Sequence, residues 1–447
     1  MYKKLLLVMI IFFVFLNISY SEDYITIDSL LPLLQKSPLY SVYKIQYENS
    51  LQNYYLSQAN LKPNITFQAS YNLGETKTII GSSTTINTTQ NTVLSLSYSQ
   101  IILPFGEAGI NLKLAELSLE QAKNNFQINY NDLFLQFLQS IYNLYLAQEK
   151  LKIYEESYSL AVKQREVAEK QFENKVINEI NLLDYKQREK LAETNYNSAK
   201  SNLELAYKSL ENLLGTTLPR VPVKIDIKYD EIEDKPEDLL SKLYTNNLSV
   251  KNASLELEKS KLNLDKAYLP SWGISFSGNY NTGNASYNAS FNTKNYLLSF
   301  NTDQTFGDTI SSSKESWNIK IQFSIPILDG GSSNINKTQA ELSLKQTRIN
   351  FEKTKKEVEL NFWKTYYNLI QAQSVIKQKE IALEQKRLNF EAQKIRYSLG
   401  LITDLDLKSY EIEFIQAKYD LEDAILNYNL LRVQLTNLLG NLGGNLL

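Results

Sequence analysis

The spacing of apolar residues along the chain changes between two periods, and each period predicts a different element. From Asp28 to about Leu61 the spacing is helical, and Asp28 or Ser29 can cap this helix. A longer row with steps of three and four predicts a helix over 107–174, followed by a return helix over 182–214. The long row comprises Leu119, Ala122, Phe126, Leu133, Phe137, Ile141, Leu144 and Leu151. At ~1.5 Å per residue this helix would extend ~100 Å, which exceeds the core of a globular domain.

Alternation of apolar and polar residues predicts two strands in each half of the chain. The four alternating segments begin at Ile65, Leu94, Ile274 and Ile319. Each has about the 9–11 residues that cross a bilayer when a strand is tilted. Their apolar faces carry Tyr and Phe, whereas their polar faces carry Ser, Thr, Asn and Gln. The segments between the paired strands, 74–91 and 283–316, are rich in Ser, Thr and Asn, so we expect loops there.

The chain contains an internal repeat. Val176–Gly215 aligns without a gap on Leu401–Gly440 at an offset of 401 − 176 = 225 residues, and both segments end in Asn-Leu-Leu-Gly. Between the copies, the two prolines of Leu218-Pro219-Arg220-Val221-Pro222 break any helix. The expected organisation is a first repeat over 22–215, a linker over 216–236 and a second repeat over 237–447.

The N-terminus has the pattern of a secretory signal peptide over residues 1–21. Lys3 and Lys4 precede an apolar run that ends at Leu16, and Ser19-Tyr20-Ser21 offers a cleavage site between small residues. A membrane anchor is the alternative, but the run is shorter than the ~20 residues that a spanning helix needs. Because no apolar run of that length follows, membrane insertion of the mature chain is expected through strands.

Composition excludes several classes of function. The 447 residues include no His and no Cys, so the usual ligands of zinc, haem and iron–sulfur centres are missing, as are the imidazole base and the thiolate nucleophile. We therefore expect no metal, no cofactor and no enzyme activity. Glu411 and Glu413 could form a catalytic pair, but their helical setting beside Lys and Gln favours a solvated face. The net charge of −2 argues against nucleic-acid binding.

Four strands cannot close a barrel by themselves. Open sheet edges are costly in lipid, because each unpaired backbone group there costs several kcal/mol. Closure is therefore expected from several chains around a water-filled lumen. A soluble β-domain with a helical stalk is the alternative, but the signal peptide, the strand lengths and the duplication argue against it.

Four short motifs occur in a characteristic order. They are Gln35-Lys36-Ser37-Pro38, Leu61-Lys62-Pro63 with its counterpart Tyr268-Leu269-Pro270, Ile327-Leu328-Asp329-Gly330-Gly331, and Tyr397-Ser398-Leu399-Gly400. In these motifs and their order the sequence resembles the outer membrane efflux protein family, the TolC-like channels of Gram-negative envelopes. The resemblance covers nearly the whole mature chain.

The resemblance implies an α+β membrane protein and a homotrimer. Its twelve-stranded β-barrel, with four strands per chain, would lie in outer-membrane lipid and continue into a twelve-helix α-barrel that crosses the periplasm. The implied function is the exit duct of a tripartite efflux or type I secretion system, working with a periplasmic adaptor protein and an inner-membrane transporter. The alternative function is a non-conducting structural or adhesive envelope protein that uses the same helical tube.

The resemblance also implies an adaptor contact where the long helix of each repeat turns back. Leu399, Gly400 and Leu401 fall on the family's groove-forming motif, which contacts the tip of the adaptor in its members. The counterpart of Gly400 in the first repeat is Lys175, so we expect the two grooves to differ.

The same turns carry the candidate gate. Asp406 falls where family members place an acidic ring at the periplasmic constriction, and Ser409 stands where some members carry a second acid. Tyr397 matches one partner in the polar links of the closed tip, whereas Asn181 replaces an Asp and Ile402 replaces an Arg. We therefore expect a latch with fewer charge-assisted hydrogen bonds.

Four acids lie near the starts of the return helices and can favour their dipoles. They are Glu179, Asp184, Asp404 and Asp406. The interaction with the dipole contributes ~0.3–1 kcal/mol for each acid. For Glu179 and Asp404 we expect helix capping. Asp184 is also included in the candidate gate.

Overall fold

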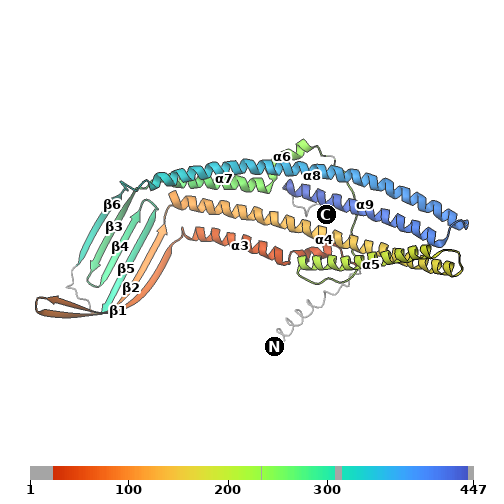
Figure 1. The fold of residues 1–447 in the computed structure, drawn as a ribbon. Helices are drawn as coiled ribbons and strands as arrows, with labels where there is room; N and C mark the ends of the chain where they lie inside the picture. Colours follow the sequence, from red (N-terminus) through yellow and green to blue (C-terminus); the bar gives the residue numbers. More distant parts are fainter. Residues whose placement is uncertain (1–23, 233, 308–314, 441–447) are drawn as a thin grey trace, which may run out of the picture. The chain divides into compact units, whose positions relative to one another are not determined.

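The structure is a computed structural model that describes residues 24–232, 234–307 and 315–440 (Figure 1). The signal peptide expected at residues 1–21 lies outside the described residues. The chain divides into two compact units, each assembled from segments far apart in the sequence. The sheet unit comprises Ile45–Phe126 and Leu248–Glu357, and the helical unit comprises Met1–Lys44, Gln127–Asn247 and Val358–Leu447.

The sheet unit contains six antiparallel strands in the order β1-β2-β5-β4-β3-β6. The strands are β1 (Asn64–Ile80), β2 (Ser83–Ile101), β3 (Gly273–Thr282), β4 (Ala285–Asn292), β5 (Leu297–Gly307) and β6 (Ser316–Ser324). Sequence alternation correctly predicted β1, β2, β3 and β6. The edges of the sheet are β1 and β6.

The expected count of four strands per chain is wrong for this sheet, which has six strands within the described residues. Both β4 and β5 lie inside 283–316, which composition identified as a loop. The hairpin of β1 and β2 likewise continues through the second expected loop, 74–91, and turns at Gly81 with a φ of 63°. The polar positions of an amphipathic strand are also Ser, Thr and Asn, so composition alone could not separate strand from loop.

One face of the sheet is apolar and solvent-exposed in the single chain. The exposed fraction is 74% for Trp317 and 76% for Ile319 on β6, and 68% for Phe67 on β1. These side chains alternate with polar neighbours because successive residues of a strand point to opposite faces. The exposed face therefore needs a further partner, such as lipid.

Helices that contribute residues to the sheet unit are α3 (Pro38–Ala59), α4 (Gly106–Glu173), α7 (Leu248–Ala267) and α8 (Ser332–Ser398). Within this unit α7 contacts the first part of α4 through polar pairs. Lys259 Nζ lies 3.2 Å from Gln121 Oε1, and Lys266 Nζ lies 2.9 Å from Glu107 Oε1. Among the described residues, no helix combines the length and the apolar character needed to span a membrane.

The helical unit is built from the remaining parts of α3, α4 and α8 together with four further helices. These are α2 (Ile27–Leu34), α5 (Glu179–Leu214), α6 (Pro236–Asn246) and α9 (Asp404–Leu438). The predicted long helix over 107–174 is confirmed as α4, and the return helix over 182–214 as α5. In the second repeat, α8 and α9 form the corresponding pair.

The single opening helix expected over 28–61 is wrong, because the structure breaks it into α2 and α3. Pro38 begins α3, where its missing N–H costs nothing because the first N–H groups of a helix have no intrahelical partner. Ser37 Oγ accepts a hydrogen bond from the Tyr40 N–H at 3.3 Å. The cap of α2 is Thr26 rather than Asp28 or Ser29.

The apolar core of the helical unit forms around the middle of α4. The predicted row is buried there, since Phe137, Ile141 and Leu144 are each 0% exposed. Side chains from α2, α5 and α9 complete this core, including Leu34, Leu210 and Leu426. Because full burial of such a side chain contributes ~1.5–3 kcal/mol, this cluster provides a major part of the unit's stability.

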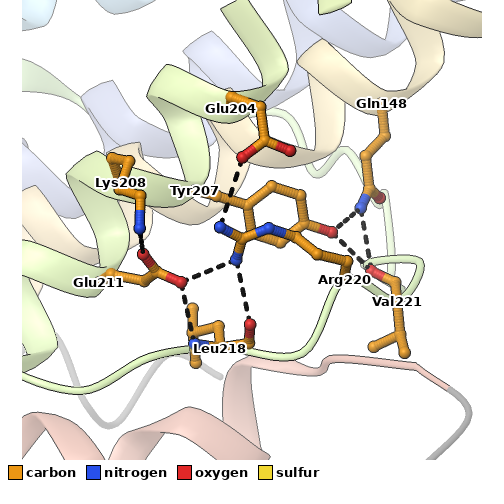
Figure 2. A network of polar contacts seen from close by, with 8 residues as sticks. All are labelled: Gln148, Glu204, Tyr207, Lys208, Glu211, Leu218, Arg220 and Val221. Carbon is orange, nitrogen blue, oxygen red and sulfur yellow. Dashed lines mark hydrogen bonds and ion pairs between the residues drawn. The ribbon is translucent and has the colours of Figure 1, made fainter.

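The segment after α5 is held against the helices by a polar network (Figure 2). The Glu211 carboxylate accepts hydrogen bonds from Arg220 at 2.7 Å, Lys208 at 2.8 Å and the Leu218 N–H at 3.1 Å. These donors lower the pKa of Glu211 to about 2, the hydrogen bond from Lys208 being the largest cause. The network thus ties α5 to the proline-containing segment that follows it.

A second set of bonds in Figure 2 ties the same segment to α4. The Tyr207 hydroxyl donates to the carbonyl of Val221 at 3.0 Å, and Gln148 Nε2 donates to that carbonyl at the same distance. Gln148 Oε1 accepts from the Val223 N–H at 2.8 Å. The chain between the two repeats is therefore hydrogen-bonded to both α4 and α5 at this point.

Candidate functional site at the helical turns

The two helical turns of the helical unit are built in the same way. The first joins α4 to α5, and the second joins α8 to α9. At the end of α4, the N–H groups of Lys175 and Val176 donate to the carbonyls of Phe172 and Gln171 at 2.9 and 2.8 Å. At the end of α8, Gly400 and Leu401 donate to Tyr397 and Arg396 at 2.9 Å. Both patterns are Schellman motifs, which satisfy the last carbonyls of a helix.

The residue with left-handed backbone conformation differs between the turns. Gly400 has a φ of 71°, whereas its counterpart Lys175 has a φ of 60°. A residue with a Cβ is strained in this region, by ~1–2 kcal/mol relative to a right-handed conformation. The first turn is therefore formed at a conformational cost that the second turn avoids.

Each return helix begins with a side-chain cap, and the capping residues are also counterparts at the offset of 225. Asn178 Oδ1 accepts from the Asn181 N–H at 2.9 Å, and Thr403 Oγ1 accepts from the Asp406 N–H at 3.2 Å. Glu179 and Asp404 lie in the first turns, where their charge favours the helix dipole. They are not the capping residues, which corrects the expectation of caps at these two positions.

Asp406 completes a capping box in the second turn only. Its Oδ2 accepts from the Thr403 N–H at 3.0 Å and from the Thr403 hydroxyl at 2.7 Å. The hydrogen bond from the Thr403 side chain is the largest cause of a lowered pKa for this carboxyl. Asp406 is therefore exposed, ionised and fixed in one orientation, with no cation paired to it within the described residues.

The acids of the two turns exchange places between the repeats. Asp406 is the counterpart of Asn181, and Asp184 is the counterpart of Ser409. Asp184 Oδ2 pairs with Arg188 at 2.8 Å, one helical turn further along α5. Ser409 is half-buried. Each turn thus carries one acid among these positions, and the unpaired negative charge belongs to Asp406.

The remaining candidate residues are surface features of the turns. Leu399 is 68% exposed and Leu401 is 64% exposed, and Gly400 between them has no neighbouring atom within 4 Å of where a Cβ would lie. Tyr397 is exposed and Ile402 is half-buried. Within the described chain the Tyr397 hydroxyl has no hydrogen-bond partner, so its link to a neighbouring helix stays a prediction.

The first turn presents apolar side chains of its own that sequence reasoning did not select. Val176 is 70% exposed and Ile180 is 75% exposed, and Leu183 on the next turn of α5 is also exposed. Val176 is the counterpart of Leu401. The offset of 225 was the signal that could have identified Val176.

Polar contacts also connect the two helical pairs, and no local sequence pattern predicts them. Lys408 on α9 pairs with Glu156 on α4 at 3.0 Å, and the Tyr145 hydroxyl of α4 bonds Glu422 at 2.9 Å. Lys150 Nζ lies 4.7 Å from the ring centroid of Tyr419. The partners lie more than two hundred residues apart in sequence, so only the fold brings them together.

The site is an exposed surface that combines apolar side chains with a capped carboxylate. Among the described residues there is no group of three or more His, Cys, Asp or Glu side chains that could hold a metal ion. Asp406 is engaged in a capping box and Asp184 in an ion pair, while Glu179 and Asp404 lie in the first turns of their helices. What the arrangement offers is two exposed apolar tips beside fixed negative charges.

Known proteins share this architecture. The family model for outer membrane efflux protein matches residues 32–216 and 239–441. No curated protein matches the chain. Among solved structures, the CmeC outer membrane channel of Campylobacter jejuni has a TM-score of 0.69 at 16% identity, covering 92% of this chain and 84% of its own.

Two further channels have the same fold. The outer membrane protein VceC of Vibrio cholerae has a TM-score of 0.66 at 14% identity, covering 93% of this chain and 96% of its own. The open state of the Neisseria gonorrhoeae MtrE outer membrane channel has a TM-score of 0.65 at 15% identity, covering 92% and 88%. At these identities the likeness concerns the fold.

Proposed function

Because the chain belongs to the outer membrane efflux protein family, we propose that it is the exit duct of a tripartite efflux or type I secretion system. It is an outer membrane efflux channel with a periplasmic helical part, and not an enzyme. In the proposed assembly three copies form one duct, and an inner-membrane transporter and a periplasmic adaptor deliver the substrate to it.

The observation that carries this proposal is the pairing of two matched turns in one chain. At each turn the long helix ends in a Schellman motif and the return helix begins with a side-chain cap. Each turn also exposes apolar residues. Three chains would place six such turns around one opening. An adaptor could then contact equivalent apolar tips, of which Leu401 and Val176 are the matched examples.

The gate in this proposal rests on Asp406. Its carboxylate is held by Thr403 and has no basic partner among the described residues, whereas Asp184 is neutralised by Arg188. Three copies of Asp406 around a narrow opening would repel one another and attract cations. The first repeat has Asn181 at the position that Asp406 occupies in the second repeat. We therefore expect one strong acidic ring rather than two.

The test is a conductance measurement on single channels in planar lipid bilayers. We expect Asp406→Asn, which keeps an acceptor for the Thr403 N–H, to reduce cation selectivity and block by multivalent cations. Asp404→Asn removes the same charge two residues earlier and serves as the matched control. A wild-type protein that never conducts would support the structural or adhesive alternative. Unchanged selectivity and block in Asp406→Asn would remove this residue from the gate.

A further inference from the structure

The hairpin formed by β4 and β5 is an integral part of the sheet and not an appendage. It lies between β2 and β3, and it is paired on both sides. β5 follows β2 from Asn91↔Gly307 to Ile101↔Leu297, and β4 follows β3 from Ser275↔Asn292 to Thr282↔Ala285. The two strands that flank the hairpin are therefore nowhere direct neighbours within the described sheet.

The hairpin also continues both faces of the sheet. On the polar face, one row across the strands reads Thr66, Ser97, Asn301, Asn288, Asn279 and Asn318. On the opposite face, the adjacent row reads Ile65, Tyr98, Phe300, Ala289, Gly278 and Ile319. Because a slip of one residue would move every side chain to the other face, this register keeps the apolar and polar faces of the hairpin aligned with those of its neighbours.

The charged residues in this part of the sheet lie on its polar face. In the part of the sheet that β5 shares with its neighbours, Asp303 is on the polar face of β5, and Lys320 is on the polar face of β6. The apolar positions of β3, β4, β5 and β6 carry no charge. Such a surface suits lipid on one side and water on the other.

The edges of the sheet are suited to join copies of the chain. All neighbouring strands are antiparallel and their number is even, so the edge strands β1 and β6 run in opposite directions. The β6 edge of one copy can therefore extend the sheet antiparallel to β1 of the next. In lipid an unpaired backbone group finds no water to bond, which favours this closure.

We propose that each chain contributes six strands to the membrane wall, with its β1 edge paired to the β6 edge of a second copy of this chain. Together with the proposed function, in which three copies form one duct, this gives 3 × 6 = 18 strands instead of twelve. Because barrel diameter grows roughly linearly with strand number, the outer mouth is ~1.5-fold wider than a twelve-stranded one.

The first experiment determines which strands are neighbours in the membrane. The natural chain has no Cys, so pairs of introduced thiols can be linked without background. We expect Ser97→Cys with Asn301→Cys, on β2 and β5, to be joined within one chain by a short thiol crosslinker. Ser97→Cys with Asn279→Cys is the matched control, because three strand spacings of ~4.8 Å separate these positions. Linkage of the control pair, with none between Ser97→Cys and Asn301→Cys, would overturn the proposal.

The second experiment tests the joint between copies. Asn318→Cys on β6 is combined in turn with a thiol on the polar face of β1, at Thr66, Gln68, Ser70 or Asn72. We expect at least one combination to yield crosslinked dimers and trimers of the full chain in outer membranes. If all four combinations yield only monomers, the shared six-strand wall is refuted even where Ser97→Cys and Asn301→Cys are joined.

The third experiment measures the width of the mouth. Deleting residues 284–307 removes β4 and β5 and leaves β2 and β3 antiparallel, so a four-stranded sheet can still form. Exclusion of graded polymers added on the extracellular side reports the outer mouth even when the inner end is narrow. We expect the deletion to reduce the limiting polymer diameter by about a third. An unchanged limit in a conducting variant would overturn the six-strand wall but leave the proposed function standing, whereas a wild-type protein without conductance would refute the function itself.

Discussion

The helical unit contains two helical pairs related by the internal repeat, α4 with α5 and α8 with α9. They share buried residues near the middle of the long helices and differ near the turns. Near the middle of the long helices, Phe137 of α4 corresponds to Phe362 of α8, and both are 0% exposed. Leu144 and Leu369 are related in the same way. At these two positions the buried residue is therefore the same in both copies, whereas buried Phe134 and Ile141 of α4 correspond to Glu359 and Tyr366 of α8.

Toward the turns the same two pairs diverge. Arg165 of α4 bonds Glu189 of α5 at 2.8 Å, whereas the counterparts Phe390 and Phe414 form stacked rings 5.9 Å apart. An ion pair and an aromatic pair thus perform the same task of holding a return helix to its long helix. The duplicated scaffold thus keeps identical buried residues at only some matched positions, and different chemistry holds each return helix near its turn.

The largest expected effect tests the shared core. We expect Phe137→Ala and Phe362→Ala each to lower the free energy of unfolding by about 3–5 kcal/mol, because both leave a cavity in a closed environment. Unfolding of the detergent-solubilised protein by denaturant, followed by circular dichroism, measures this. Lys364→Ala, at an exposed position of α8, is the control and is expected to stay within ~0.5 kcal/mol. A large loss in only one of the two Phe variants would break the equivalence of the copies.

The second prediction concerns the hydrogen-bond network around Glu211, called here the Glu211 clamp, which the first repeat has and the second lacks. Glu211 holds Arg220, Lys208 and the Leu218 N–H, whereas its counterpart Thr436 bonds the carbonyl of Arg432 in its own helix at 2.9 Å. We expect Glu211→Gln to lower the midpoint of thermal unfolding at pH 7. Thr436→Ala, which changes only a bond within α9, is the control with a smaller shift.

The pH dependence of this effect has a definite sign. The pKa of Glu211 is lowered from 4.5 to about 2 in the folded protein, so its stabilisation is fully present above pH 4.5. It is lost as the pH falls from there through about 2. The difference in midpoint between wild type and Glu211→Gln should therefore shrink over this range. A difference that stayed constant down to pH 2 would mean that the charge of Glu211 does not stabilise the clamp.

Much of the helical scaffold could be predicted from the sequence because its signals are local and repeated. The row through Phe137 and Ile141 has helical spacing over a long segment, and the return helix follows from the offset of 225. The break before Pro38 was missed because apolar spacing continues across it, although proline at the start of α3 was a signal for it.

The sheet and the site were predicted less completely, for two physical reasons. The strands β4 and β5 were missed because the polar face of an amphipathic strand has the composition of a loop, although Tyr287 and Phe291 alternate correctly. Contacts such as Lys408 with Glu156 join residues distant in sequence, and no local pattern encodes them. Residues whose role depends on a neighbouring chain, such as Tyr397, stay predictions.

The third prediction exploits the different residues at the left-handed position of the turns. We expect Lys175→Gly to raise the free energy of unfolding by about 1 kcal/mol, because glycine adopts this conformation without a Cβ clash. The reverse change, Gly400→Lys, should lower it by a similar amount at an open position. Denaturant unfolding of both variants measures the pair. Opposite signs are required, and equal signs would show that something other than backbone conformation distinguishes the turns.

The smallest expected effect concerns the capping box that only the second turn has. The Asp406 carboxylate accepts two hydrogen bonds from Thr403, and its lowered pKa means that the charged form stabilises the folded state. Asp406→Asn should therefore cost ~0.5 kcal/mol or less at pH 7, since the group is exposed.

This contribution is present above the unfolded pKa of ~3.9 and is lost as the pH falls through the lower folded value. The variant Asn181→Asp places a carboxylate at the matching position of the first turn, three residues after Asn178. It should gain the dependence on pH that Asp406→Asn loses. Thermal midpoints of both variants and of wild type at pH 7 and pH 3 measure this exchange. If Asp406→Asn keeps the wild-type loss of stability between these values, the cap of α9 depends on Thr403 alone.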